Sequence, residues 1–404
     1  MSPPPLVSLA GVFDATVGGT AAGETVLRIV TATTGTLLLQ NKTWSVTYAS
    51  EPKSLHSTAP DGSLKLTATN HNLLAGTIGT SPVKLERAVL RPISPSELAQ
   101  SDPGPTGALK AFFKTVPDYA KVVQDTSTFW YAFGPVLYRG RLDGTARLLC
   151  IASDPGPTEC LPFVRRTLVG DSGQRVQGFL AKLGLSRSYV LVNAFAVALH
   201  PDQEAAGLKL LTTNGALKAW RNELLSRLLQ QNSFEAIIAF GKNAELAYDL
   251  WRSAEPAATQ VPVTKVDHPA AVDRTGSGDD QPLQRWAAAI PSLQAQVRPD
   301  PGFGPRPPNY GAYFTENDYA RIPRWDLPKV SPAYVGDDSW ARAGSPPQHN
   351  CCERPSPDDG VSLMLRPPPG QGQALRYEYK GGKLSKTLDM NGKHVKTDPY
   401  GIPV

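Results

Sequence analysis

The chain has 404 residues, of which 41% are apolar and 19% charged, so it is long enough for two or three hydrophobic cores. That length and composition exclude a short peptide, a coiled coil and a wholly disordered chain. A net charge of +5 is compatible with a polyanionic partner without requiring one. No apolar run approaches the ~18 residues of a membrane span, and the start MSPPPLVSLAGVF lacks the pattern of a secretory signal. We therefore expect a cytoplasmic protein with no membrane partner.

Residues 1–134 predict a β-rich N-terminal extension, because they are rich in Thr, Gly, Val and Ser. Three pieces of this extension have the composition of strands, at 26–33, 35–39 and 44–49. A short helix is expected near 107–114. The extension therefore differs in character from the segment that follows it.

Residues 135–300 predict an α/β domain. Four continuous apolar runs have the length of strands that are buried on both faces, at 146–152, 189–195, 235–240 and 261–266. The segments between them place apolar side chains on one face of a helix, as Val176, Phe179 and Leu180 do. This alternation predicts a three-layer α/β/α fold with a central four-stranded parallel sheet.

Residues 301–404 predict a proline-rich C-terminal extension. Seventeen of the 38 prolines lie between Pro299 and Pro403, yet the same stretch carries Trp and Tyr residues that a disordered linker seldom contains. We expect an extended segment that docks on the α/β domain. The alternation at Tyr377 and Tyr379, with Gly-Gly and Asn-Gly pairs after it, predicts a terminal β-hairpin.

The four cysteines predict no metal site and no disulfide framework. Cys150, Cys160, Cys351 and Cys352 form no CxxC pair and no histidine-containing ligand pattern. Reduced thiols in a reducing compartment account for them.

Polar residues follow the predicted strands at the edge where a parallel sheet binds its ligands. Asp154 comes just after the first run, Asn193 ends the second, and His268 follows the fourth. Each residue has an ordinary structural explanation, as a turn, a cap or a core histidine. Their joint placement favours a common site at that edge.

The order of these motifs resembles the uracil-DNA glycosylase superfamily, in particular a divergent form of its bacterial branch. The resemblance covers about residues 135–300 and rests on five stretches, SDPGPTE, PFV, YVLVNAF, AIIAF and HPAAVDR. That branch places a glutamate where this chain has Ser153, whereas another branch has an aspartate at the position of Asp154.

The resemblance implies a catalytic role for two residues. Asp154 would orient water and offset the positive charge that develops on the sugar, and His268 would donate a hydrogen bond to O2 of the departing base. Glu159 is the back-up acid. The bacterial branch usually holds an iron–sulfur cluster on four cysteines. This chain lacks cysteines at the expected place, so no cofactor is expected.

The resemblance also implies contacts with the base and with DNA. Asn193 would read the edge of a flipped pyrimidine and Phe163 would stack on it, whereas Val272 and Arg274 would act as minor-groove wedge and phosphate contact. Strict uracil enzymes carry a tyrosine that blocks C5 of the base where this chain has Gly156. The missing ring would leave room for a C5 substituent.

The expected function is that of a monomeric, monofunctional DNA glycosylase that flips out a modified pyrimidine and leaves an abasic site. Such a base would be hydroxymethylated or glucosylated cytosine of phage DNA. With a substrate of this kind, the protein would resemble anti-phage glycosylases. One alternative is a uracil-DNA glycosylase of base excision repair. Another is a non-catalytic DNA-binding protein of the same fold, and an enzyme of nucleotide metabolism is disfavoured because no phosphate-binding glycine motif occurs.

Overall fold

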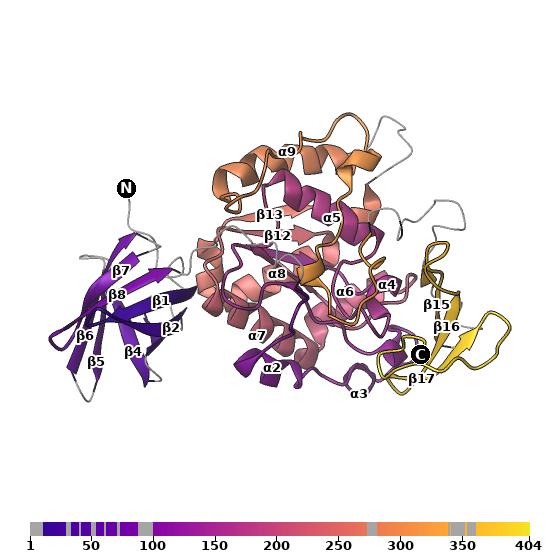
Figure 1. The fold of residues 1–404 in the computed structure, drawn as a ribbon, viewed down its shortest axis with the longest axis horizontal. Coiled ribbons are helices and arrows are strands. Elements are labelled where there is room, and N and C mark those ends of the chain that lie inside the picture. The colour runs from indigo at the N-terminus through magenta and orange to yellow at the C-terminus, as the bar shows by residue number, and fades with distance from the viewer. Residues whose placement is uncertain are drawn as a thin grey trace.

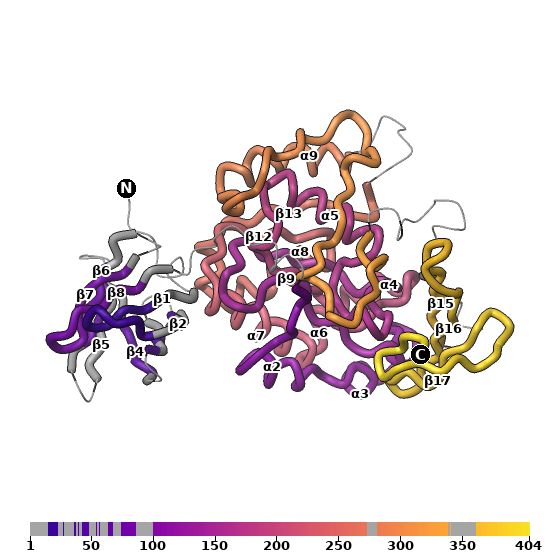
Figure 2. The backbone as a smooth tube through the Cα atoms, viewed as in Figure 1, coloured from indigo at the N-terminus to yellow at the C-terminus, as the bar shows by residue number. Residues whose placement is uncertain are grey.

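The computed structural model describes residues 11–29, 34–39, 42–49, 54–59, 62–70, 73–87, 100–272, 281–337, 340, 352–353 and 361–404. Three parts follow one another along the chain: an N-terminal barrel, an α/β domain with an extended arm, and a small C-terminal sheet (Figure 1). The barrel and the C-terminal sheet lie at opposite ends of the α/β domain in the tube view (Figure 2).

The N-terminal part is a closed antiparallel barrel in which each strand pairs with the next and the first pairs with the last. Its interior is filled because apolar and polar residues alternate, so that Leu64 and Leu66 are buried while Lys65 and Thr67 are exposed. The strands are β1 (Gly11–Val17), β2 (Thr20–Ile29), β3 (Thr34–Leu39), β4 (Lys42–Ala49), β5 (Ser54–Ala59), β6 (Gly62–Asn70), β7 (Leu73–Ile78) and β8 (Ser81–Arg87).

The expected strands at 35–39 and 44–49 fall within β3 and β4. The expected strand at 26–33 coincides with the end of β2, and residues 30–33 lie outside the described part of the chain. After the barrel, the expected short helix is α2 (Gly107–Phe113).

The central sheet has five strands in the order β13-β12-β10-β11-β9. Four of them are parallel, β10 (Leu148–Ala152), β11 (Tyr189–Asn193), β12 (Ala236–Phe240) and β13 (Val263–Val266). The fifth, β9 (Arg139–Gly140), runs antiparallel to β11. The expectation of a four-stranded, purely parallel sheet is therefore corrected to a five-stranded mixed sheet. A two-residue Arg-Gly strand carries no apolar run that a sequence could reveal.

Helices pack on both faces of this sheet because successive strand residues point to opposite sides. Cys150 belongs to the core shared with α5 (Asp171–Lys182) and α9 (Gln281–Gln296), whereas Ile151 belongs to the core shared with α7 (Gly215–Gln231) and α8 (Lys242–Ala254). Shorter helices complete the domain: α3 (Tyr119–Val123), η2 (Tyr131–Phe133), α4 (Pro157–Cys160), α6 (Glu204–Thr213), η3 (Pro256–Gln260) and η4 (Pro269–Ala271).

Residues 298–337 form an extended arm that contains only two short helices, η5 (Glu316–Asp318) and η6 (Arg324–Asp326). Each of three buried aspartates of the arm meets a basic residue of the α/β domain. Their shortest ion-pair distances are 2.7 Å for Asp300–Arg147, 2.8 Å for Asp318–Lys182 and 3.4 Å for Asp326–Arg139. The arm thus docks on the domain as the sequence suggested, and it does so through charge as well as through its aromatic rings.

The C-terminal part is a four-stranded antiparallel sheet of β14 (Cys352–Glu353), β15 (Ser362–Leu365), β16 (Leu375–Lys380) and β17 (Lys383–Asp389). The last two strands form the expected hairpin, whose turn uses Gly381 and Gly382 at φ of +57° and +77°. Tyr377 and Tyr379 on β16 are buried in one cluster with residues of the α/β domain. The sheet therefore shares a hydrophobic cluster with the α/β domain.

Asp300 offers a test of how the arm stabilises the fold. Its carboxylate, 3% exposed, also accepts hydrogen bonds from the backbone N–H groups of Ser186 and Arg187 and from the hydroxyl of Ser188. Burial alone would raise the pKa of Asp300, but the hydrogen bonds from Ser188 and Arg187 and the charge of Arg147 outweigh it and hold that pKa below its usual value.

We predict that Asp300→Asn lowers the free energy of unfolding at pH 7 by about 2–4 kcal/mol, because Arg147 loses its closer charged partner and keeps only the longer pair with Glu235, at 3.9 Å. A carboxyl whose pKa is lowered by folding stabilises above its unfolded pKa and loses that effect as the pH falls through the folded pKa. The difference between the two proteins in urea denaturation should therefore shrink below about pH 4. Asp202→Asn, at an exposed aspartate, is the control. A difference that stays constant with pH would contradict this account.

Candidate functional site

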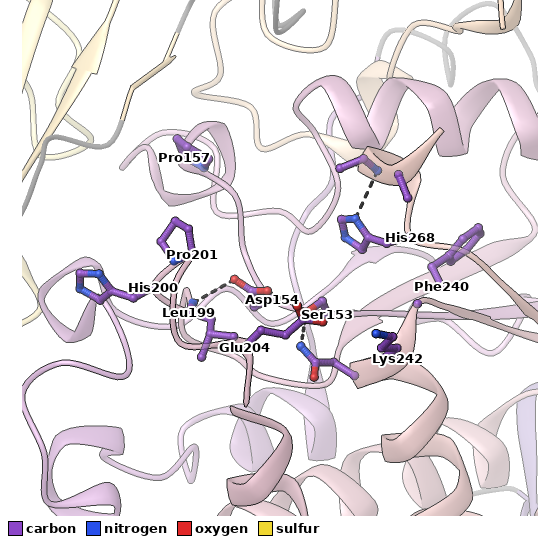
Figure 3. A pocket seen from close by; sticks show the side chains of 14 residues that line it. Ser153, Asp154, Pro157, Leu199, His200, Pro201, Glu204, Phe240, Lys242 and His268 are labelled. Atoms are coloured by element: carbon purple, nitrogen blue, oxygen red, sulfur yellow. Dashed lines mark hydrogen bonds between the residues drawn. The ribbon is translucent and has the colours of Figure 1, made fainter. Parts of the chain in front are cut away.

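A cavity of about 730 Å³ opens at the carboxyl-terminal edge of the parallel strands. Its wall combines the residues that follow β10, the ends of β12 and β13, and the segment from 199 to 204 (Figure 3). Asp154 and His268, which the sequence placed after two different strands, both line it. The expected convergence of these two residues is confirmed.

Asp154 is held from two sides in the cavity. The hydroxyl of Ser153 donates to its Oδ1 at 2.8 Å, and the backbone N–H of Leu199 donates to its Oδ2 at 2.9 Å. Ser153 in turn accepts a hydrogen bond of 2.7 Å from Nδ2 of Asn243, in the first turn of α8. These bonds fix the direction of the carboxylate.

His268 begins η4, and its ring orientation follows from one hydrogen bond. The backbone N–H of Ala270 donates to Nδ1 at 3.2 Å, so in the neutral ring the proton is on Nε2. Burial and, as a smaller cause, the positive charge of the nearby Arg175 guanidinium together lower the pKa of His268 to about 4. Arg175 also donates to the carbonyls of Pro269 and Val272 and so holds this loop on α5. At neutral pH the cavity therefore holds an uncharged imidazole that can donate through Nε2.

Gly241 allows α8 to begin beside His268. Its φ is +83°, and a Cβ built there would stand 2.9 Å from Cβ of His268. Both the backbone conformation and the contact distance exclude a side chain at this position. The glycine that follows β12 therefore brings Lys242 and Asn243, at the start of α8, to the cavity.

Asn193 ends β11, in register with Ala152 of the neighbouring strand. Its side chain points to the same face of the sheet as that of Leu191. This face packs against α5 and α9 and also carries Phe240. The residue is 6% exposed, and neither its amide oxygen nor its amide nitrogen has a hydrogen-bond partner in the part of the chain that the structure describes. A buried amide without partners costs about 1–3 kcal/mol, which an ordered water or a ligand would offset. Asn193 is not among the residues that line the cavity.

Three other residues that the resemblance singled out are buried away from the cavity wall. Phe163, 2% exposed, meets Tyr377 of the C-terminal sheet with ring centroids 6.1 Å apart. Val272, 2% exposed, packs in the core beside α5 and does not protrude as a wedge. Glu159, 4% exposed, accepts hydrogen bonds from the backbone N–H groups of Gly156 and Val169. Packing and local hydrogen bonding account for their positions in this structure.

The remaining two residues have different positions. Gly156 precedes α4, and Pro157 next to it lines the cavity. The φ of Gly156 is −80°, and a Cβ there would meet Oε1 of Glu159 at an ordinary 3.6 Å. A side chain at position 156 therefore causes no backbone strain. Arg274 lies outside the described residues.

The structure adds cavity residues that the sequence did not indicate. Phe240 forms an apolar part of the wall, and Glu204 and Lys242 bring opposite charges to it. His200 stacks on Trp130 with ring centroids 3.9 Å apart. Of these, Lys242 follows a predicted strand and could have been found by the same rule as Asp154. Phe240 is the last residue of that strand, whereas Glu204 and His200 reach the cavity through packing between distant segments, which leaves no local pattern.

No family model matches the chain, and no curated protein is significantly similar to it in sequence. None of the helices within the described residues is long and apolar enough to cross a membrane. The same part of the chain contains no group of three or more His, Cys, Asp or Glu side chains that could hold a metal ion.

We predict that the imidazole of His268 titrates near pH 4 in an NMR pH titration, with the signal assigned by its loss in His268→Gln. A histidine whose pKa is lowered by folding stabilises the protein above its unfolded pKa, near 6.5, and loses that effect as the pH falls toward 4. The melting temperature of wild type should therefore fall relative to that of His268→Gln within this window. A His268 signal that titrates near pH 6.5 would refute the assignment of a neutral, half-buried ring.

Proposed function

We propose that this protein is a DNA glycosylase that flips a pyrimidine nucleotide into the cavity and hydrolyses its N-glycosidic bond. One observation carries the proposal: a hydrogen-bonded carboxylate, Asp154, and an uncharged histidine, His268, line the same cavity. Hydrolysis of a nucleoside needs one group for the positive sugar and one for the leaving base, and these two side chains have those chemistries. The unpartnered amide of Asn193 supports a third role, recognition of the base edge.

In the proposed reaction, the C1′–N1 bond breaks and its electron pair leaves with the base. Asp154 offsets the positive charge on the sugar and accepts a proton from the water whose oxygen bonds to C1′. Nε2–H of His268 donates a hydrogen bond to O2 of the base, where negative charge develops. The products are the free base, which takes up a proton at the end, and DNA with an abasic site. Ser153 and Asn243 act on the reaction through the position of Asp154.

We infer that the α/β domain has the three-layer architecture of the uracil-DNA glycosylase superfamily, to which β9, the barrel and the C-terminal sheet are additions. The helices on both faces of the sheet support this inference. DNA is the proposed partner of the whole chain, which we propose acts as a monomer.

A pyrimidine with a C5 substituent is the proposed base. The cavity volume of about 730 Å³ lies in the upper part of the ~300–1,000 Å³ range of ligand sites and leaves room beside the ring. Gly156, next to the cavity residue Pro157, has no side chain, and Glu204 and Lys242 in the wall supply polar groups that can hydrogen-bond hydroxyls. Hydroxymethylated and glucosylated cytosines of phage DNA carry a substituent with hydroxyl groups at C5 and are therefore the proposed bases. Plain uracil is the alternative base for the same chemistry.

The role of Asp154 is tested by Asp154→Asn, which keeps the shape of the side chain and removes its charge. We predict that single-turnover excision falls by on the order of 10²-fold or more while DNA affinity is kept. The measurement uses duplexes that carry uracil, 5-hydroxymethylcytosine or its glucosylated form, followed by alkaline cleavage of abasic sites. Asp143→Asn, at an exposed aspartate that does not line the cavity, is the matched control. Excision by Asp154→Asn at the wild-type rate would remove Asp154 from the mechanism, and binding without excision in wild type would favour a non-catalytic protein.

The base is tested by Gly156→Tyr, which introduces a ring where C5 of the flipped base is expected. We predict that excision of the glucosylated base falls at least about tenfold more than excision of uracil, because only the large substituent competes with the ring for space. Gly156→Ala controls for the loss of the glycine, whose φ of −80° any residue can adopt. Equal losses on both bases in a folded Tyr variant would favour ordinary uracil repair.

A further inference from the structure

The arm encloses a second cavity, of about 550 Å³, between residues 321 and 335. It shares no lining residue with the cavity of Asp154 and His268. Its wall combines two arginines and a tryptophan, Arg321, Arg324 and Trp325, with the apolar side chains of Ile322, Leu327 and Val335. None of the residues that line it is acidic.

The two arginines are held in place by backbone carbonyls. Arg324 donates from Nη1 to Ser331 and from Nη2 to Lys329, both at 2.7 Å, and Arg321 donates from Nη2 to Ala333 at 3.1 Å. Within the described residues, neither guanidinium forms an ion pair with a carboxylate. Burial lowers the pKa of Arg324, and the positive charge of Arg321 lowers it further. The two charges therefore repel each other beside the cavity, and several of their N–H groups are left to bind a ligand.

Two neighbouring features strengthen this positive character. The indole Nε1 of Trp325 is buried and has no hydrogen-bond partner among the described residues. Asp326 follows Trp325 in the chain but directs its carboxylate to Arg139 and Tyr189, at 3.4 and 2.8 Å. The acid that could have neutralised the arginines is thus used elsewhere.

We propose that this cavity binds a phosphate monoester that carries a flat ring, namely a nucleoside monophosphate or the 5′-phosphorylated end of a DNA strand. Two guanidiniums match the two negative charges of a monoester better than the single charge of a carboxylate or of a phosphodiester. The indole N–H adds a third donor. The apolar wall accommodates the ring, and the volume is in the range of small-ligand sites. The proposal does not depend on the glycosylase reaction.

The test is calorimetric titration of the full chain with deoxycytidine monophosphate (dCMP) and with deoxycytidine. We expect dCMP to bind at least about tenfold more tightly than deoxycytidine, and Arg321→Gln to weaken dCMP binding about tenfold by removing a charged donor. Arg321 is exposed and makes one hydrogen bond, so the variant should fold, which its melting temperature checks. Arg252→Gln, at an exposed arginine of α8, is the matched control and should bind dCMP as wild type does.

A second variant, Trp325→Phe, keeps a ring and removes the indole N–H, and should weaken dCMP binding by a smaller factor. Oligonucleotides with a 5′-phosphate or a 5′-hydroxyl then separate the two sources of the ligand. If Arg321→Gln weakens only the phosphorylated strand and dCMP, the strand end is bound as well as the free nucleotide. If it weakens dCMP alone, the free nucleotide is the ligand. Binding of dCMP no tighter than that of deoxycytidine, or unchanged in Arg321→Gln, overturns the proposal.

Discussion

Three buried ion pairs hold the arm to the α/β domain, and much of the remaining structure depends on them. Asp300 accepts hydrogen bonds from the residues just before β11 and pairs with Arg147, just before β10, so one carboxylate joins the starts of two neighbouring strands. Asp318 can reach Lys182 because the arm lies close against α5 at Gly178, where a Cβ would collide with the carbonyl of Asp318. The second cavity therefore lies in an arm whose three buried aspartates are each paired with a basic residue of the α/β domain.

The cavity at the sheet edge shows how a polar site is built where strands end. The carboxylate of Asp154 is bound by groups from three segments: its neighbour Ser153, the backbone at Leu199, and Asn243 through Ser153. His268 is kept neutral by burial and by Arg175, whose own charge is paired with Asp171. A hydrogen-bonded carboxyl group and a neutral imidazole thus lie in one cavity. Such a separation of roles is what acid–base chemistry requires.

The sequence predicts the α/β domain well because its strands are continuous apolar runs, and it predicts Asp154 and His268 because both follow such runs. It could not predict β9, which has two residues, or the closure of the barrel, since alternation shows which side chains point inward but not which strands meet. The position of Phe163 was not predictable for a different reason. A segment more than two hundred residues later, at Tyr377, covers it, and no local pattern records such a contact.

The cluster around Phe163 and Tyr377 also affects the order in which the protein can fold during synthesis. The barrel uses only residues before 88, so it can close while the ribosome is still making the α/β domain. The core that contains Phe133, Phe163 and Val164 is completed by Leu375, Tyr377 and Tyr379. Until those tyrosines leave the exit tunnel, the loop that follows Asp154 presents apolar side chains to solvent. The nascent chain therefore has a long interval in which this loop is open to chaperones.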